Sequence, residues 1–175
     1  MAKKKKKKDT LSLVLLIAVL VGTICAIVGL FTDWFISTTT SAIIGSESSS
    51  NYGLFAEEFS KWAENATENG NTELFPISLV IIAGIGATVL SAVCLLLALL
   101  NKAGVYSMGG LLKLLIPIVA IVFGVLVFVF SNSYASSLVS VDLGVIVESS
   151  WTTAIGVYLT GIGSIVSGGA YLFSK

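Results

Sequence analysis

The sequence predicts an all-α membrane protein: a four-transmembrane-helix bundle with a small extracellular β-sheet cap and a short extracellular helix. Hydrophobic residues make up 55% of the 175 residues and charged residues only 11%, whereas a soluble globular protein carries about 25% charged residues. Four stretches contain no charged side chain, at residues 10–32, 74–101, 114–141 and 149–174. Each supplies the roughly 20 helical residues that cross a bilayer, and buried helices of soluble proteins rarely run so long without polar residues.

We predict the four transmembrane helices at residues 11–35, 77–100, 110–130 and 151–173. Trp34 and Trp151 stand at predicted membrane interfaces, where an indole buries its ring and keeps its N–H hydrated. No Asp, Glu, Lys or Arg lies deep in a predicted span. A proton relay, an ion-coupled transporter or a voltage sensor would need such groups, so these classes are disfavoured.

The lysines orient the predicted bundle. Residues 3–8 are all lysine, Lys102 and Lys113 flank the turn between the second and third spans, and Lys175 ends the chain, whereas Lys61 alone falls on the other side. Cytoplasmic segments of membrane proteins collect lysine and arginine. We therefore predict an integral, multi-pass protein of the plasma membrane with both termini in the cytoplasm.

This orientation divides the chain between the two sides of the membrane. The predicted cytoplasmic parts are the basic tail 1–10, the turn 101–109 and the end 174–175, and the extracellular parts are the first loop 36–76 and the second loop 131–150. Nine of the ten acidic residues fall in or beside the extracellular parts. A formal net charge of zero thus conceals a strong charge dipole.

The lysine run at the start of the chain allows two interpretations. Near an anionic leaflet each lysine adds about 1 kcal/mol of attraction to lipid headgroups. The candidate headgroup contacts are Lys3, Lys4, Lys5, Lys6, Lys7 and Lys8. The alternative, which we favour, is a solvated tail that only sets the topology. The apolar region behind it, about 24 residues, exceeds the 7–15 of a signal peptide, so we expect a retained signal anchor.

The first loop contains a strand pattern and an amphipathic helix pattern. Residues 36–44 are rich in Thr, Ser and Ile and predict a strand, and the Gly, Ser and Asn residues at 45–51 predict a turn. In the predicted helix 55–67, Phe55, Phe59 and Trp62 recur at helical spacing. We favour an aromatic face that covers the sheet or the bundle end. The alternative makes Phe59 and Trp62 contacts to a partner or to lipid.

The second loop contains one further strand pattern. Apolar residues alternate with mostly polar or small ones along residues 138–147, which predicts a strand that pairs with the first-loop strand. In the first loop, Asn65-Ala66-Thr67 matches a glycosylation sequon, which matters only in a glycosylating organism.

Small residues mark one face of several spans. The set comprises Gly22, Ala26, Gly29, Ala83, Ala87, Gly163, Ser164, Ser167 and Gly168. Small residues three or four positions apart on a helix let helix backbones approach closely. We favour packing within the bundle over an intermolecular face. Cys25 and Cys94 lie at different predicted depths, so we expect no disulfide between them, because the two Cα atoms must come within about 7 Å.

The sequence offers little to an enzyme. There is no histidine, the commonest general base and metal ligand, and the adjacent Glu57 and Glu58 would diverge around a helix. The glycines between residues 161 and 169 lie in a predicted membrane helix rather than in a phosphate-binding loop. We therefore predict a non-enzymatic protein with no cofactor, no metal, no nucleic-acid partner and no evident small-molecule substrate.

Several short motifs follow one another along this layout. In chain order they are Trp34, Gly53-Leu54-Phe55, Ser133-Tyr134-Ala135, Asp142-Leu143-Gly144, Trp151 and the glycine-rich residues 161–169. Together with four spans, a large first loop, a short cytoplasmic turn and a small second loop, this order resembles the claudin and peripheral-myelin-protein superfamily. The resemblance implies a four-helix bundle under an extracellular sheet.

The chain departs from that family at identifiable positions. The two first-loop cysteines of the family are absent, and Glu58 stands near the position of the first, so no family disulfide can close this loop. Lys175 follows the fourth span directly, with no scaffold-binding motif after it. We expect a distant relative of prokaryotic type rather than an animal junction protein.

The resemblance implies a structural or adhesive membrane protein that assembles with itself through its extracellular cap and helix faces. An accessory subunit of a larger membrane complex or channel is the alternative. A third possibility is a cation-preferring pore lined by Asp33, Glu57, Glu58 and Glu64. The expected partners are the lipid bilayer and either the protein itself or other membrane proteins.

Overall fold

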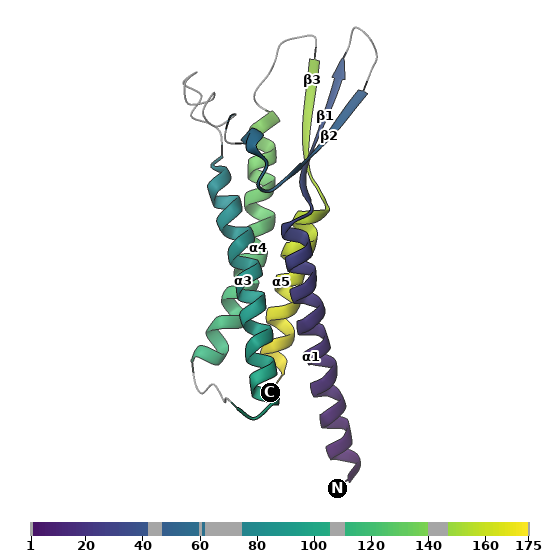
Figure 1. The fold of residues 1–175 in the computed structure, drawn as a ribbon, viewed down its shortest axis with the longest axis vertical. Coiled ribbons are helices and arrows are strands. Elements are labelled where there is room, and N and C mark those ends of the chain that lie inside the picture. The colour runs from purple at the N-terminus through teal and green to yellow at the C-terminus, as the bar shows by residue number, and fades with distance from the viewer. Residues whose placement is uncertain are drawn as a thin grey trace.

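The structure is a computed structural model that describes residues 2–41, 47–59, 61, 75–105, 111–139 and 147–174. The elements are α1 (Ala2–Leu30), β1 (Asp33–Ser41), β2 (Glu47–Gly53), α3 (Ile77–Lys102), α4 (Leu112–Val139), β3 (Val147–Thr153) and α5 (Ile155–Phe173). The four helices run alongside one another, and the strands rise from one end of them (Figure 1). Both termini lie at the opposite end. We call the two ends the sheet end and the terminal end.

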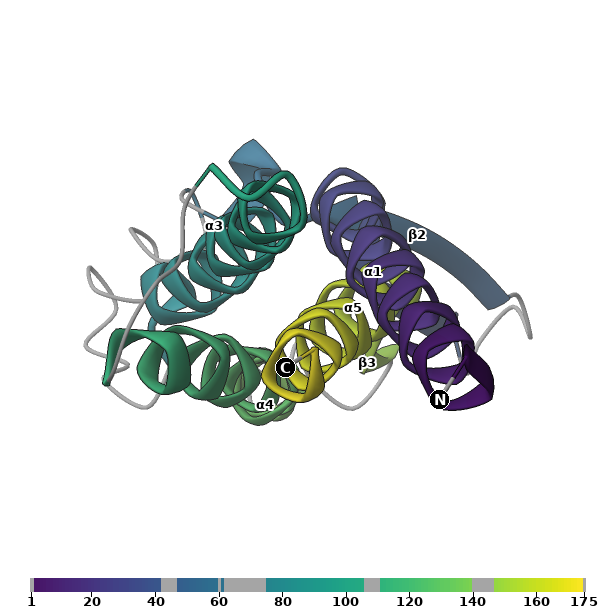
Figure 2. The same ribbon diagram turned by 90° about the horizontal axis from the view of Figure 1, so that it is seen from below.

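Among the described residues, four helices are long and apolar enough to cross a membrane, by length and composition. They cover Thr10–Leu30, Ile77–Lys102, Leu112–Leu138 and Ile155–Phe173. Large apolar side chains such as Ile17, Ile82 and Val125 stay exposed on their outward faces, as in a bundle that is surrounded by lipid rather than by water. Seen from below, α1 and α5 lie on one side of the bundle and α3 and α4 on the other (Figure 2). The predicted four-helix architecture with a small sheet is confirmed.

Glycines let α1 and α5 pack with their backbones in contact. A Cβ added at Gly22 would lie 2.6 Å from the carbonyl oxygen of Gly163, and one added at Gly163 would lie 2.5 Å from the carbonyl oxygen of Gly22. Two turns further along, a Cβ at Gly29 would lie 2.6 Å from the backbone nitrogen of Thr160. These small residues therefore pack within the bundle, as predicted.

Buried hydroxyl groups join the helices across the bundle interior. The Oγ1 of Thr23 lies 3.0 Å from the carbonyl oxygen of Ser91 and 3.2 Å from the Oγ of Ser167, which connects α1, α3 and α5. The Oγ of Ser164 donates to the carbonyl oxygen of Ala120 at 2.8 Å, which connects α5 to α4. Such bonds between membrane helices contribute about 0.6 kcal/mol on average.

The first helix ends at Leu30, five residues before the predicted end at residue 35. Thr32 turns the chain, because its backbone N–H and its Oγ1 both donate to the carbonyl oxygen of Gly29, at 3.3 and 3.0 Å. The aromatic and β-branched residues that follow favour an extended backbone. Trp34 therefore lies on a strand rather than at the end of a helix.

The three strands form one antiparallel sheet in the order β2-β1-β3. β1 confirms the predicted first-loop strand, although it occupies Asp33–Ser41 rather than residues 36–44. The predicted turn at 45–51 is wrong for residues 47–51, which form most of β2. Serine and asparagine have low strand propensity, but the register places Ser49 and Ser50 opposite Thr38 and Ser37 of β1, and this pairing overrides the local preference.

Most of the predicted second-loop strand 138–147 lies outside the described residues, at 140–146. Residues 138 and 139, the start of the predicted strand 138–147, continue α4, which runs nine residues past the predicted end at residue 130. The strand itself, β3, begins at Val147 and includes Trp151. α5 accordingly starts at Ile155 rather than at residue 151.

Candidate functional site

The sheet end carries the candidate functional site, which we call the cap: the three strands together with residues 54–59 and 61. Trp34 anchors the cap to the bundle. Its ring is fully buried, and its Nε1 donates to the carbonyl oxygen of Gly29 at 2.8 Å. A Cβ at Gly84 of α3 would lie 2.8 Å from Trp34 Cη2, and one at Gly156 of α5 would lie 2.6 Å from Trp34 Cδ1. The indole is thus held between two helices.

Leu54 packs beside Trp34 against α3. A Cβ at Gly84 would also lie 3.1 Å from Leu54 Cδ2, and Leu54 is buried. The backbone N–H of Ala154 donates to the carbonyl oxygen of Trp34 at 2.8 Å. Two residues that the sequence motifs singled out, twenty positions apart, therefore share one contact that fixes the base of the sheet.

An aromatic cluster fills the space between the sheet and the helix ends. Phe35 of β1 packs edge-on against Phe59 and tilted against Tyr134 of α4, with ring centroids 5.4 and 5.3 Å apart, and Phe59 packs edge-on against Tyr134 at 5.5 Å. Tyr52 of β2 extends the cluster to Phe59 at 5.9 Å and to Trp151 of β3 at 5.2 Å. All three strands are thereby tied to α4.

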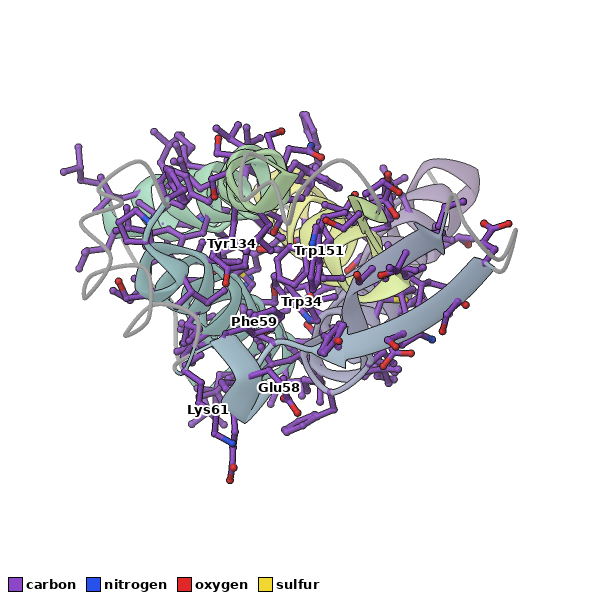
Figure 3. All side chains as sticks on the ribbon, turned by 90° about the horizontal axis from the view of Figure 1, so that it is seen from above. Trp34, Glu58, Phe59, Lys61, Tyr134 and Trp151 are labelled. Atoms are coloured by element: carbon purple, nitrogen blue, oxygen red, sulfur yellow. The ribbon has the colours of Figure 1, made fainter. Side chains whose placement is uncertain are left out.

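Seen from above, Trp34, Phe59, Tyr134 and Trp151 lie together over the centre of the bundle, whereas Lys61 points away from it (Figure 3). Aromatic pairs in these geometries contribute about 0.5–1.5 kcal/mol each beyond their burial. The cap is therefore a packed extension of the bundle rather than a pair of loose loops.

The aromatic residues of the first loop differ in their exposure. Phe59 is only 2% exposed, which agrees with the favoured interpretation that the aromatic face covers the bundle end and contradicts its role as an open contact. Phe55 is 53% exposed, so the final residue of the Gly53-Leu54-Phe55 motif points outward. Of the predicted helix 55–67, residues 57–59 and 61 are described as helical.

Other predicted residues lie beyond the described ranges. Trp62, Glu64, Asn65, Leu143 and Gly144 belong to this group. The backbone of Lys3–Lys8 lies within α1, so the lysine run continues the first helix toward the terminal end. Cys25 and Cys94 are free thiols on α1 and α3, as predicted.

Polar residues make up much of the sheet. The cross-strand rows nearest its tip are Ser49–Thr38–Ser150, Ser48–Thr39–Ser149 and Glu47–Thr40–Glu148. At the base, Asp33 accepts a hydrogen bond from Asn51 Nδ2 at 3.0 Å. Of the proposed pore-lining acids, Glu57 and Glu58 are exposed on the cap. Within the described ranges, no group of three or more His, Cys, Asp or Glu residues is placed to hold a metal ion.

The two edges of the sheet differ in their surroundings. β3 lies against α4. Along β2, Glu47–Asn51 are all exposed, and no described strand pairs with its outward edge. Edge strands are usually protected by lysine, proline, a bulge or a covering segment, but β2 contains neither lysine nor proline, and the irregularity in its pairing lies at the base, between Asp33 and Phe35.

Sequence reasoning missed this edge because its residues predict a turn. One local signal was available: Tyr52 follows the serine run and precedes Gly53, and aromatic residues favour strands. The signal is short, however, and only the paired strand β1 makes an extended backbone favourable here.

No model of a protein family matches the chain, and no curated protein matches it significantly. The claudin-like assignment therefore stays a prediction from motif order and layout.

Proposed function

We propose that this chain is a non-enzymatic, claudin-like tetraspan protein of the cell membrane, with a structural or adhesive role, which assembles with itself through its cap. The single observation that carries the proposal is the edge of β2, which no described strand pairs, on a sheet that is packed firmly onto a four-helix bundle. A strand edge presents alternating backbone donors and acceptors, which pair with any second strand.

The charge distribution supports a bundle that spans the membrane with the cap outside. Lys102 is the last residue of α3 and is exposed, and Lys113 lies in the first turn of α4. The described cap carries the acids Asp33, Glu47, Glu57, Glu58 and Glu148 and the single lysine Lys61. Cytoplasmic segments collect lysine, so this asymmetry favours a cytoplasmic terminal end.

Self-assembly follows from the chemistry of the edge. The exposed residues of β2 are mostly short and uncharged, so they leave room for a neighbouring backbone at the usual strand spacing of about 4.8 Å. The anchoring of β1 through Trp34 and of Phe35 through the aromatic cluster holds the edge in place before any partner arrives. Preorganisation of this kind lowers the entropy lost on association.

Cysteine cross-linking in intact membranes tests the proposal. In a variant with Cys25→Ala and Cys94→Ala, Ser49→Cys places one thiol on the β2 edge, and Thr152→Cys places another exposed thiol on β3 as the matched control. With a short bifunctional maleimide, we expect several-fold more homodimer from Ser49→Cys than from Thr152→Cys.

Two results would overturn the proposal. Equal or absent homodimer from both variants would show that the β2 edge is not a self-association surface. Adducts with larger membrane proteins in a fixed ratio, identified by mass spectrometry, would instead indicate an accessory subunit of a larger complex.

A further inference from the structure

We propose that the basic start of α1 binds anionic lipid headgroups of the leaflet at the terminal end. We call this part the lysine segment, Lys3–Lys8. The sequence predicts a solvated tail here, whereas the structure places the backbone of all six lysines in the helix that becomes the first span. The inference rests on the proposed function only for a bundle that spans the membrane, and it does not require self-assembly through the cap.

The helix keeps the lysine segment close to the membrane surface. α1 runs without a break from Ala2 to Leu30, and its candidate span begins at Thr10. At about 1.5 Å per residue, the backbone of Lys8 lies at most about 3 Å beyond the span and that of Lys3 at most about 10 Å. A fully extended chain would carry Lys3 about 23 Å away. The headgroup layer is about 5–8 Å thick on each side of the hydrocarbon core, so the helical form holds the lysine segment in or directly beside this layer.

Lipid rather than protein surrounds the part of α1 next to the lysine segment. α1 runs past the other helices at the terminal end (Figure 1), and its N-terminal end lies apart from them when the molecule is seen from below (Figure 2). Residues 10–14, at the start of the span, are all exposed, including Leu11 at 60% and Val14 at 55%. In a membrane these residues meet acyl chains, so the headgroups of the same lipids surround the helix where the lysines follow.

The charges of the lysine segment oppose its helical form. Lysines three or four positions apart, such as Lys3 and Lys7, lie on the same side of a helix and repel each other. The first turn contains no acidic residue, although the positive end of the helix dipole favours acids there. Asp9 is the only acid among residues 1–32. A layer of anionic headgroups supplies the counter-charge, so the helix and an anionic surface stabilise each other.

The arrangement of these charges favours a lipid surface over a protein groove. Successive residues lie about 100° apart around a helix, so six consecutive lysines distribute positive charge over its whole circumference. A helix that binds in a protein groove presents one apolar face, and the lysine segment contains no apolar residue. Clusters of about four to eight lysines directly beside the cytoplasmic end of a membrane helix are typical of anionic lipid binding.

Other lysines at the terminal end add to the same surface. α3 ends at Lys102, which is exposed, and α4 carries Lys113 in its first turn. Both of these helix ends lie at the terminal end of the bundle (Figure 1). The lysine segment alone contains six of the ten lysines of the chain, so we expect anionic lipids to concentrate around α1 in particular.

Spin-labelled lipids measure this preference with the full chain. The protein is reconstituted into bilayers of mixed phosphatidylcholine and phosphatidylglycerol. Electron spin resonance then compares how much of each lipid, spin-labelled in turn, is immobilised at the protein surface. We expect a several-fold preference for phosphatidylglycerol at low salt. The preference should disappear near 1 M salt, where the screening length falls to about 3 Å.

Two variants separate the charge of the lysine segment from its backbone conformation. Replacing all six lysines by glutamine removes the charge and keeps good helix formers, so the preference should fall to the level that Lys102 and Lys113 supply. Thr10→Pro keeps every lysine but interrupts the helix at the start of the span, because proline lacks the N–H and clashes with the carbonyl four residues before it. Relative to the matched control Thr10→Ala, its preference should fall by about twofold or more, since the attraction falls off within a screening length.

Amide hydrogen exchange of residues 2–9 provides a second measurement. Protection of these amides should be higher in bilayers that contain phosphatidylglycerol than in phosphatidylcholine alone. The inference would be overturned by equal immobilisation of the two lipids, or by a preference that survives in the glutamine variant or in Thr10→Pro. Binding of a labelled oligonucleotide to the lysine segment without any lipid preference would overturn it in favour of a nucleic-acid partner.

The outcome is independent of the cap. Cross-linking of Ser49→Cys is measured on the same reconstituted membranes. Loss of the lipid preference with retained cross-linking would overturn the lipid site alone. A retained preference without cross-linking would support the lipid site and overturn self-assembly through the cap.

Discussion

Replacing Phe59 by alanine tests whether the aromatic cluster holds the cap on the bundle. Phe59 is 2% exposed and contacts the rings of Phe35, Tyr52 and Tyr134. A buried phenylalanine removes about 150–250 Å² from water, which at about 25 cal/mol per Å² corresponds to about 4–6 kcal/mol. Measured Phe→Ala losses in protein cores are about 3–5 kcal/mol. We expect Phe59→Ala to destabilise the cap by about 3–5 kcal/mol.

Phe55→Ala is the matched control, since Phe55 is the same residue type four positions away and is 53% exposed. About half of its area is buried, so its loss should be about 2–3 kcal/mol by the same conversion.

Hydrogen exchange in detergent measures both variants segment by segment. Phe59→Ala should lower the protection of the β1 amides, whereas the amides of α1 should keep theirs. The reasoning would be refuted by unchanged protection of β1 in Phe59→Ala, or by an equal loss in Phe55→Ala.

Two further predictions concern the bundle and the base of the cap. Gly22→Ala should lower thermal stability by about 1–3 kcal/mol, because its Cβ would meet the carbonyl oxygen of Gly163 at 2.6 Å. Gly169→Ala, whose Cβ meets nothing within 4 Å, should be neutral or stabilising by up to about 1 kcal/mol; equal losses in thermal unfolding would contradict the close contact of α1 and α5. Trp34→Phe removes the hydrogen bond to Gly29, whose carbonyl oxygen still accepts from Thr32, so loss of this bond should cost about 0.5–1.5 kcal/mol, and an unchanged melting temperature would argue against this anchor.

The motif residues have a clear physical role whatever the family of the chain. Trp34 and Leu54 come from different segments and meet at Gly84, where any side chain larger than hydrogen would collide with the indole. The first loop contains no cysteine, so this contact and the aromatic cluster hold the loop on the bundle without a disulfide. We therefore expect the cap to survive reducing conditions, which thermal unfolding with and without a reducing agent checks.

The number, order and approximate bounds of the four long helices could be predicted from the sequence alone. The signal is local: each charge-free stretch satisfies its own backbone hydrogen bonds as a helix, and its length and composition are sufficient to identify it. The close approach of the helices at Gly22 and Gly163 could also be anticipated, because only small residues permit it.

The strands of the cap and the burial of its side chains depend on the tertiary structure. Residues 47–51 have the composition of a turn, and they become a strand only because β1 supplies hydrogen-bonding partners. Phe55 and Phe59 occupy the same face of a predicted helix, yet the folded chain exposes one and buries the other against Phe35 and Tyr134. Strand pairing and burial at the sheet end depend on residues far away in the sequence, whereas a membrane helix depends mainly on its own, and this difference separates what the sequence determined from what only the fold decided.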